Sequence, residues 1–214
     1  MSLASISSSR ETELESGGFL KGVAIAIVTQ NKDPDGLCRV KLRFPWTGQA
    51  SESDWARMAM PMTGKDRGLV LIPEVGDEVL VAFEREDMRF PYVLGALWNG
   101  KDKPPLANVD GKNDKRILKS RKKHYLLLDD GSPGVVELAH EKGRKVTFND
   151  NGIVMQDEKG NVFKIDSNSG AITIEAKGQL KIKAASITVE ATGTLDIKAS
   201  ATLTVRGALV NINP

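Results

Sequence analysis

The stretch ITIEAKGQLKIKAASITVEATGTLDIKASATLTVRGALVNINP, from Ile172 to Pro214, repeats a pair of aliphatic residues every seven or eight positions. One residue separates the members of each pair, as in Ile172 and Ile174. Residues at i and i+2 point to the same side of an extended chain, whereas a helix places them on different faces. Mostly Ala, Gly, Ser, Thr and Lys lie between the pairs, so the pattern predicts short strands joined by corners.

A short fixed period is typical of a solenoid, in which one repeat buries its apolar side only by stacking on others. A β-helix built by one chain needs roughly 18 residues per turn to supply three walls, and each repeat here is long enough for about one wall. We therefore expect three copies of the chain to share one core. The predicted trimer core consists of Ile172, Ile174, Leu180, Ile182, Ile187, Val189, Leu195, Ile197, Leu203 and Val205.

Two other structures compete for this segment. An ordinary sheet of hairpins is one, but the Asn-Gly and Asp-Gly pairs that close two-residue hairpins are absent between Ile172 and Pro214. A disordered polar tail is the other, and the regular aliphatic content argues against it.

The composition of the whole chain bounds the function. Its 214 residues are 40% hydrophobic with a net charge of +2, so it can bury a core and shows neither a strong nucleic-acid nor a strong membrane-surface field. The start, MSLASISSSRETELESGG (residues 1–18), lacks the apolar run of a signal peptide, and no run reaches the ~18 apolar residues of a spanning helix. We expect a soluble chain made in the cytoplasm without a signal peptide, with residues 1–18 flexible or docked on a partner.

Between Phe19 and about Gly100 the pattern changes to five strand-like runs separated by Gly, Pro and Asp turns. In the second run Val40, Leu42 and Phe44 alternate with basic residues, as in a strand with one buried and one wet face. Five short antiparallel strands in about 80 residues predict a small OB-like barrel. The runs are FLKGVAIAIVTQ (19–30), LCRVKLRFP (37–45), WARMAMPM (55–62), DEVLVAFE (77–84) and FPYVLGAL (90–97).

Two of these stretches, PEVGDEVLVAF (73–83) and PYVLGALWNG (91–100), resemble the OB-fold domain of the phage baseplate assembly protein V and VgrG spike family. RILKSRKKHYLLLDDG (116–131), GIVMQDEKGN (152–161) and the repeat are similar to the linker and β-helix of the same spikes. The resemblance covers residues 19–214 in the family's order. It implies an all-β homotrimer with a hub-docking segment (1–18), an OB-fold domain (19–100), a neck with the first β-helix rungs (101–170) and a regular, intertwined triple-stranded β-helix needle (171–214).

The resemblance also implies a function. Members of the family form the structural central spike of a contractile injection machine: a phage tail, an R-type bacteriocin, an extracellular contractile injection system or a type VI-like device. The barrels sit below a hub or baseplate, and the needle projects toward the target cell membrane. We expect this chain to be assembled into a virion tail or a phage tail-like particle.

Departures from the family pattern refine these expectations. Larger VgrG chains carry a hub domain before the barrel, so the short segment 1–18 implies a separate hub or baseplate protein. Residues 101–170 leave too little room for the lysozyme domain of some spikes. Other spikes bind iron through a His-X-His motif at the tip, whereas the histidines here, His124 and His140, lie far upstream. We therefore expect no catalytic residue, no metal site, no cofactor and no enzymatic activity.

At its end the repeat stays in phase, with Val210 and Ile212 as the last pair. A prism that stops there exposes an apolar triangle and unpaired backbone groups, which favour a bound partner. The family resemblance implies a PAAR-type tip protein, seated on Leu209, Val210, Asn211, Ile212 and Asn213. The alternative is that Pro214 and the Asn side chains close the end themselves.

Two other functions remain open. An OB-fold protein that binds single-stranded nucleic acid would use the basic run KNDKRILKSRKK (112–123), but no aromatic platform is interleaved with it, so no nucleic acid is expected. A trimeric fibre or adhesin would need a receptor-binding head, and nothing after the repeats is long enough to form one.

Overall fold

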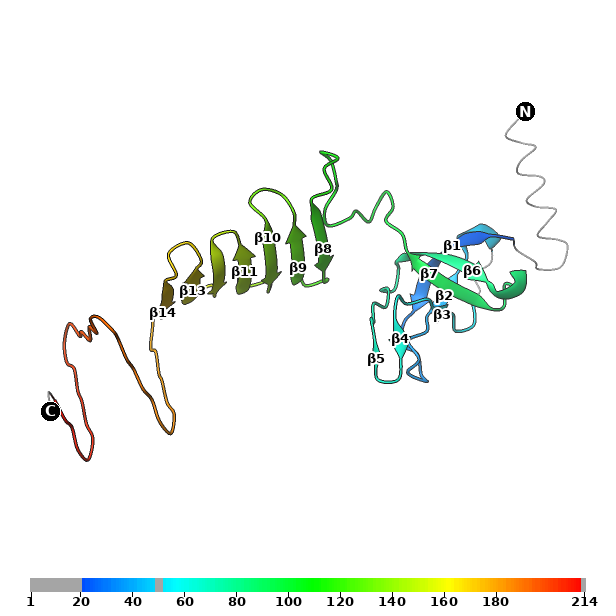
Figure 1. Ribbon diagram of the computed structural model, residues 1–214. Helices are drawn as coiled ribbons and strands as arrows, with labels where there is room; N and C mark the ends of the chain where they lie inside the picture. Colours follow the sequence, from blue (N-terminus) through cyan, green and yellow to red (C-terminus); the bar gives the residue numbers. More distant parts are fainter. Residues whose placement is uncertain (1–20, 49–51, 213–214) are drawn as a thin grey trace. The chain divides into compact units, whose positions relative to one another are not determined.

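The computed structural model describes residues 21–48 and 52–212, and the chain divides into two compact units between Val109 and Asp110 (Figure 1). In the described residues, strands account for nearly all regular structure, and the helical segments are single 3₁₀ turns, η1 (Pro45–Thr47) and η2 (Glu84–Glu86). The all-β prediction is confirmed. The predicted hub-docking segment, residues 1–18, lies outside the described residues. In the described ranges, no helix has both the length and the apolar character to cross a membrane.

The first unit holds a five-stranded sheet in the order β2-β1-β6-β7-β3. Its strands are β1 (Val23–Gln30), β2 (Lys41–Arg43), β3 (Arg57–Met58), β6 (Glu78–Phe83) and β7 (Pro91–Ala96). The two outer strands of this sheet meet where Val40 and Ala56 exchange backbone hydrogen bonds of 3.0 and 2.7 Å. Each of the five predicted runs contains one of these strands, so the OB-like fold is confirmed. One pairing differs from the prediction, because β3 runs parallel to β7 and not antiparallel to it.

The barrel core follows the predicted alternation along the second run. Val40 and Leu42 are fully buried and Phe44 is nearly so, whereas the intervening basic side chains face outward. In β6 every second residue is buried in the same way, and these residues are Val79, Val81 and Phe83. Because side chains alternate between the two faces of a strand, one face of each fills the barrel and the other meets solvent.

A second, smaller hairpin in this unit was not predicted. It consists of β4 (Thr63–Gly64) and β5 (Arg67–Gly68), which pair antiparallel. The strands of this hairpin contain only Thr, Gly and Arg, so no apolar alternation marks them in the sequence. A Cβ added at Gly68 would lie 2.8 Å from the Met62 carbonyl oxygen, so the close crossing of the hairpin requires glycine there.

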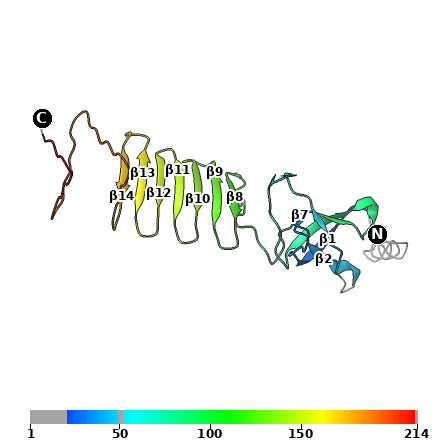
Figure 2. The ribbon, with the colours of Figure 1, turned by 90° about the horizontal axis from the view of Figure 1, so that it is seen from below.

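The second unit is an antiparallel meander of seven consecutive strands in the order β8 to β14 (Figure 2). The strands are β8 (Lys115–Lys119), β9 (Tyr125–Asp129), β10 (Val135–Ala139), β11 (Lys145–Asn149), β12 (Gly152–Gln156), β13 (Val162–Asp166) and β14 (Ile172–Glu175). Each strand pairs with the next in the chain, so the connecting turns alternate between the two edges of the sheet (Figures 1 and 2).

Asp and Asn side chains shape the turns at one edge. Asp129 Oδ1 accepts the Gly131 N–H at 3.1 Å, and Asn149 Oδ1 accepts the Asn151 N–H at 2.9 Å. Such side-chain acceptors mimic a backbone turn and end the strand locally. Gly152 then opens β12 at φ 134°, where a Cβ would lie 2.0 Å from the Ile165 carbonyl oxygen of β13. Only glycine allows this approach of the two strands.

The repeat tail differs from its prediction. Ile172 and Ile174 lie in β14, but the later pairs, from Leu180 and Ile182 to Val210 and Ile212, lie in no strand of the described chain. A strand requires a neighbour for its backbone groups. The single chain offers these pairs no neighbouring strand, so the predicted strands are absent from it.

Candidate functional site

One face of the seven-stranded sheet, here called the apolar face, carries two rows of side chains that run across all its strands. Directly opposite residues of paired strands share a face, as do residues i and i+2. The first row is Leu118, Leu126, Leu138, Val146, Met155, Phe163 and Ile174. The second row is Arg116, Leu128, Val136, Phe148, Ile153, Ile165 and Ile172. Apart from Arg116, every member of both rows is apolar.

The apolar face has no covering layer within the second unit. The buried hydrophobic cluster of the described chain belongs to the barrel, and Leu138 and Phe148 at the centre of the sheet remain 59% and 46% exposed. A sheet normally buries its apolar face against another element, and an uncovered apolar patch of this extent marks an interaction surface. The apolar face is therefore the candidate functional site.

The opposite face, here called the polar face, carries a buried carboxylate that is hydrogen-bonded to side chains of the two neighbouring strands. Glu137 of β10 accepts hydrogen bonds from Tyr125 Oη, from Lys145 Nζ at 2.8 Å and from Thr147 Oγ1 at 2.9 Å. Burial acts to raise the pKa of the Glu137 carboxyl, but the bonds from Lys145, Tyr125 and Thr147 outweigh it and leave this pKa below its usual value. The cluster ties β9, β10 and β11 together and gives the polar face its own hydrogen-bonded structure.

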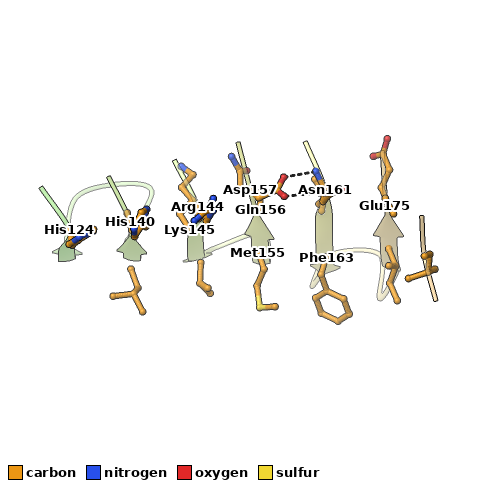
Figure 3. A pocket seen from close by; sticks show the side chains of 17 residues that line it. His124, His140, Arg144, Lys145, Met155, Gln156, Asp157, Asn161, Phe163 and Glu175 are labelled. Carbon is orange, nitrogen blue, oxygen red and sulfur yellow. Dashed lines mark hydrogen bonds between the residues drawn. The ribbon is translucent and has the colours of Figure 1, made fainter. Parts of the chain in front are cut away.

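A hollow of about 740 Å³ lies along the first row of the apolar face, open to solvent. Figure 3 shows Met155 and Phe163 pointing to the same side of their strands, while His124, His140 and Asn161 lie at the strand ends. The hollow is lined in part by the apolar side chains of the first row, and it offers space for side chains from another molecule.

The two histidines stack on each other at one edge of the sheet, with ring centroids 4.4 Å apart. His124 Nδ1 accepts the Glu141 N–H and His140 Nδ1 accepts the Lys142 N–H, both at 3.2 Å. The first of these bonds joins the turn after β8 to the turn after β10, and the second lies within the turn after β10. Over residues 21–48 and 52–212, no group of three or more His, Cys, Asp or Glu is placed to hold a metal ion.

The structure of one chain brings few of the predicted trimer-core residues together. Ile172 and Ile174 extend the two rows of the apolar face through β14. The ten predicted core residues are between 52% and 70% exposed in the single chain. Of the predicted tip-binding residues, Leu209 and Ile212 are 78% and 81% exposed, and Asn213 lies outside the described residues.

Two basic side chains of the second predicted run, Arg39 and Lys41, are paired within the chain. Arg39 binds Asp33 at 2.7 Å and also binds Asp35, and Lys41 lies 3.7 Å from Glu52. The Arg39 guanidinium holds the pKa of the Asp33 carboxyl well below its usual range. Basic groups already neutralised in this way are poorly suited to bind phosphates.

Sequence reasoning missed the apolar face upstream of Ile172, although a signal for it exists. Pairs such as Leu126 and Leu128, or Phe163 and Ile165, show the same i, i+2 spacing as the repeat. They recur at intervals of seven to ten residues, because strands and turns here vary in length. The wider spacing conceals the period that the tail shows plainly.

Comparison with known proteins bears on the first unit. Residues 24–98 match the family described as the type VI secretion system/phage-baseplate injector OB domain. Over these residues the barrel matches an injector-type OB domain, and the resemblance to the baseplate assembly protein V and VgrG spike family is confirmed for this part of the chain.

Curated relatives carry VgrG names. The chain is 33% identical over 90 residues to the type VI secretion system spike protein VgrG3 of Vibrio cholerae, covering 40% of this chain and 9% of that protein. It is 30% identical over 107 residues to the actin cross-linking toxin VgrG1 of Vibrio cholerae, covering 46% and 10%. With the spike protein VgrG2a of Pseudomonas aeruginosa it shares 35% identity over 78 residues, covering 35% and 9%. The match thus spans about a tenth of these relatives' length.

Proposed function

We propose that this chain is the structural central spike of a contractile injection machine, a homotrimer in which three apolar faces close around one axis. The single observation that carries the proposal is the uncovered apolar face, whose two rows reach Ile172 and Ile174 and continue in sequence through the tail pairs. The injector-type OB domain and the VgrG names of the relatives support the same role.

Three chains fit the apolar face better than one or two. One sheet leaves its apolar rows in water, at a cost of roughly 1.5–3 kcal/mol for each large aliphatic side chain that could be buried. Two sheets packed face to face would cover the rows of β8 to β14, but each tail repeat of seven or eight residues supplies one wall and one corner rather than a returning hairpin. Three walls related by a three-fold axis cover both regions in one continuous prism.

In this assembly the sheet from β8 to β14 forms one wall per chain, and the tail forms the intertwined triple-stranded β-helix beyond it. The tail strands, absent from the single chain, form when neighbouring chains supply their hydrogen-bond partners. The result is a rod in which unfolding one chain would expose the core of all three. Such a rod transmits axial force to a target membrane, which is a mechanical rather than an enzymatic role.

The partners follow from the two ends of the rod. On the barrel side, a separate hub or baseplate protein would receive the OB domains. On the tail side, the exposed apolar residues Leu209, Val210 and Ile212, with Asn211 and Asn213, would seat a PAAR-type tip protein. The whole would be assembled into a phage tail or tail-like particle, or a type VI-like device. An Ile212→Asp variant should then lose a tip protein that a Thr204→Asp variant, outside the predicted tip-binding residues, keeps, as judged by co-purification.

Neighbouring residues on opposite faces of β14 test the trimer itself. Ile174 stands on the apolar face and Thr173 on the polar face, and both are exposed in the single chain. Ile174→Asp places three carboxylates in the shared core, each at a cost of several kcal/mol, so sedimentation velocity should show its trimer dissociating. Thr173→Asp should remain trimeric. Equal behaviour of the two variants would contradict the proposal.

A further inference from the structure

The two edges of the seven-stranded sheet carry opposite charge. The word edge is used here for a side of the sheet where strand ends and turns lie, not for an outermost strand. The turns after β8, β10 and β12 lie at one such side, called here the basic edge, and the remaining turns lie at the other, called the acidic edge (Figures 1 and 2). The basic edge holds eight Lys and Arg against three acidic residues: Lys119, Arg121, Lys122, Lys123, Lys142, Arg144, Lys145 and Lys159 against Glu141, Asp157 and Glu158. The acidic edge holds five Asp against one Lys: Asp114, Asp129, Asp130, Asp150 and Asp166 against Lys115.

Part of this charge is already neutralised within the chain. On the acidic edge Asp130 binds Arg116 and Asp129 lies 3.5 Å from Lys115 Nζ; on the basic edge Arg144 binds Glu158 at 2.7 Å. Within residues 110–212 of the described chain, Lys122, Lys142 and Asp150 have no ion pair, and all three are exposed. The charge that remains unpaired is therefore positive at one edge and negative at the other.

The basic turns are held beside each other despite their like charge. His124 stacks on His140 at 4.4 Å and accepts the Glu141 N–H, which fixes the turn that carries Lys122 next to the turn that carries Lys142. Like charges so placed repel each other unless an opposite charge lies nearby. Such an arrangement is favourable next to an acidic surface.

From these observations we propose that the basic edge of one chain docks against the acidic edge of the next around the three-fold axis, so that the occupant of each edge is a second copy of this chain. This inference rests on the proposed trimer. In a closed ring of three identical walls, every contact is head-to-tail, so the two different edges of the sheet must meet at each corner. Because the two edges carry opposite charge, the two chains that meet at each of the three corners attract each other.

The spacing of the turns suits this contact. Because the turns alternate between the edges, a turn of the basic edge lies level with the gap between two turns of the acidic edge. The turn 120–124 falls between Asp114 and the turn 130–134, and the turn 140–144 falls between the turns 130–134 and 150–151. Along the three-fold axis, Lys142 of one chain therefore lies at the height of the unpaired Asp150 of the next chain, and Lys122 lies at the height of Asp130, which also binds Arg116 of its own chain. Complementary charge of this kind fixes the register and direction of docking.

Charge reversal of each edge in the full-length chain tests the inference. One variant combines Lys122→Glu with Lys142→Glu, a second combines Asp130→Lys with Asp150→Lys, and a third carries all four changes. A control with Lys101→Glu and Lys103→Glu has the same net charge as the first variant, but its changes lie outside the sheet. Sedimentation velocity over a dilution series at about 0.05 M and about 0.5 M salt gives the trimer dissociation midpoint.

We expect either single-edge reversal to raise the dissociation midpoint on the order of tenfold at low salt, and less at high salt because screening shortens the reach of charge. The four-fold variant should return to near the wild-type midpoint, since its edges are complementary again. The control should match the wild type. A mixture of the two single-edge variants should recover only partly, because a ring of three cannot alternate two kinds of chain without one like-charged corner.

Three results would overturn the inference. The single-edge variants could match the control, the four-fold variant could be weaker than both, or mixing could restore full wild-type stability, which requires an even-numbered ring. In the first two cases a trimeric wild type leaves the proposed function standing, whereas full recovery on mixing would also contradict the trimer. A monomeric wild type at every concentration would instead overturn the proposed function and the inference together.

Discussion

Phe163 of β13 lies opposite Ile174 of β14 in the antiparallel ladder, and both side chains stand on the apolar face. Ile174 is also a member of the first pair of the tail repeat. The row that begins at Leu118 therefore reaches the first repeat pair at Ile174, and the later pairs of the tail continue it in the sequence. This continuity is the reason for treating both as parts of a single core.

The tail is expected to depend on its core pairs in the same way as the sheet. Ile187→Asp should lower the thermal midpoint of the trimer, because three carboxylates would be buried around one axis at several kcal/mol each. The neighbouring Thr188→Asp should leave the midpoint nearly unchanged. Circular dichroism follows the rod, and tryptophan fluorescence from Trp46 and Trp55 follows the barrel, which should stay folded in both variants. A rod unaffected by Ile187→Asp would place this residue outside the core.

Acid should weaken the second unit through Glu137. The pKa of this carboxyl is lowered in the folded chain from its usual 4.5, so its stabilising contribution is complete above pH 4.5 and is lost as pH falls through the folded value. Glu137→Gln removes the titration, and the free energy of unfolding of this variant should fall less than that of the wild type between about pH 5 and about pH 3. Denaturant unfolding at the two pH values measures the difference. Parallel losses in both proteins would show that Glu137 does not titrate as the structure implies.

Glycine at position 152 should be irreplaceable. Gly152→Ala would place a Cβ against the Ile165 carbonyl oxygen and separate β12 from β13, at a cost on the order of 2 kcal/mol or more. Gly178→Ala is the matched control, since a Cβ there meets nothing within 4 Å. Hydrogen exchange of the amides in β12 and β13 should rise in the first variant and not in the second. Unchanged protection in both variants would refute this account of the turn.

The barrel should be separable from the rod. Leu42→Ala deletes a fully buried side chain and should destabilise the barrel by about 2–5 kcal/mol, whereas Arg43→Ala on the outward face should change stability by less than about 0.5 kcal/mol. Urea unfolding followed by tryptophan fluorescence reports the barrel. A similar loss in both variants would mean that the outward face of β2 is buried in the assembly.

The sequence predicts the barrel well because apolar residues recur in each of the five runs around its strands. Val40, Leu42 and Phe44 alternate with basic residues, and the structure buries all three. The hairpin β4 and β5 has only Thr, Gly and Arg in its strands, so it gives no such signal and was missed. The same limit explains the second unit: the pairs of β9 to β13 were present in the sequence, but their uneven spacing hid the sheet that joins them.

The candidate site could be predicted only in its last part. Ile172 and Ile174 were assigned to the core from the repeat, whereas Leu126, Val146 and Phe163 become visible as one surface only when strand pairing aligns them. The charge of the two edges is hidden for the same reason, because Asp130 and Asp150 are twenty residues apart in sequence and share an edge only in the meander. The pattern along a chain fixes which side a residue faces, but only strand pairing and turn positions fix its neighbours.

The most direct test of the central claim is the solution mass of the purified full-length chain, measured by light scattering over a range of concentrations. We predict three times the 23.2 kDa of one chain, because three apolar faces are needed to close the core along both the sheet and the tail. A mass of one chain at every concentration, or of two chains, would contradict the three-walled spike.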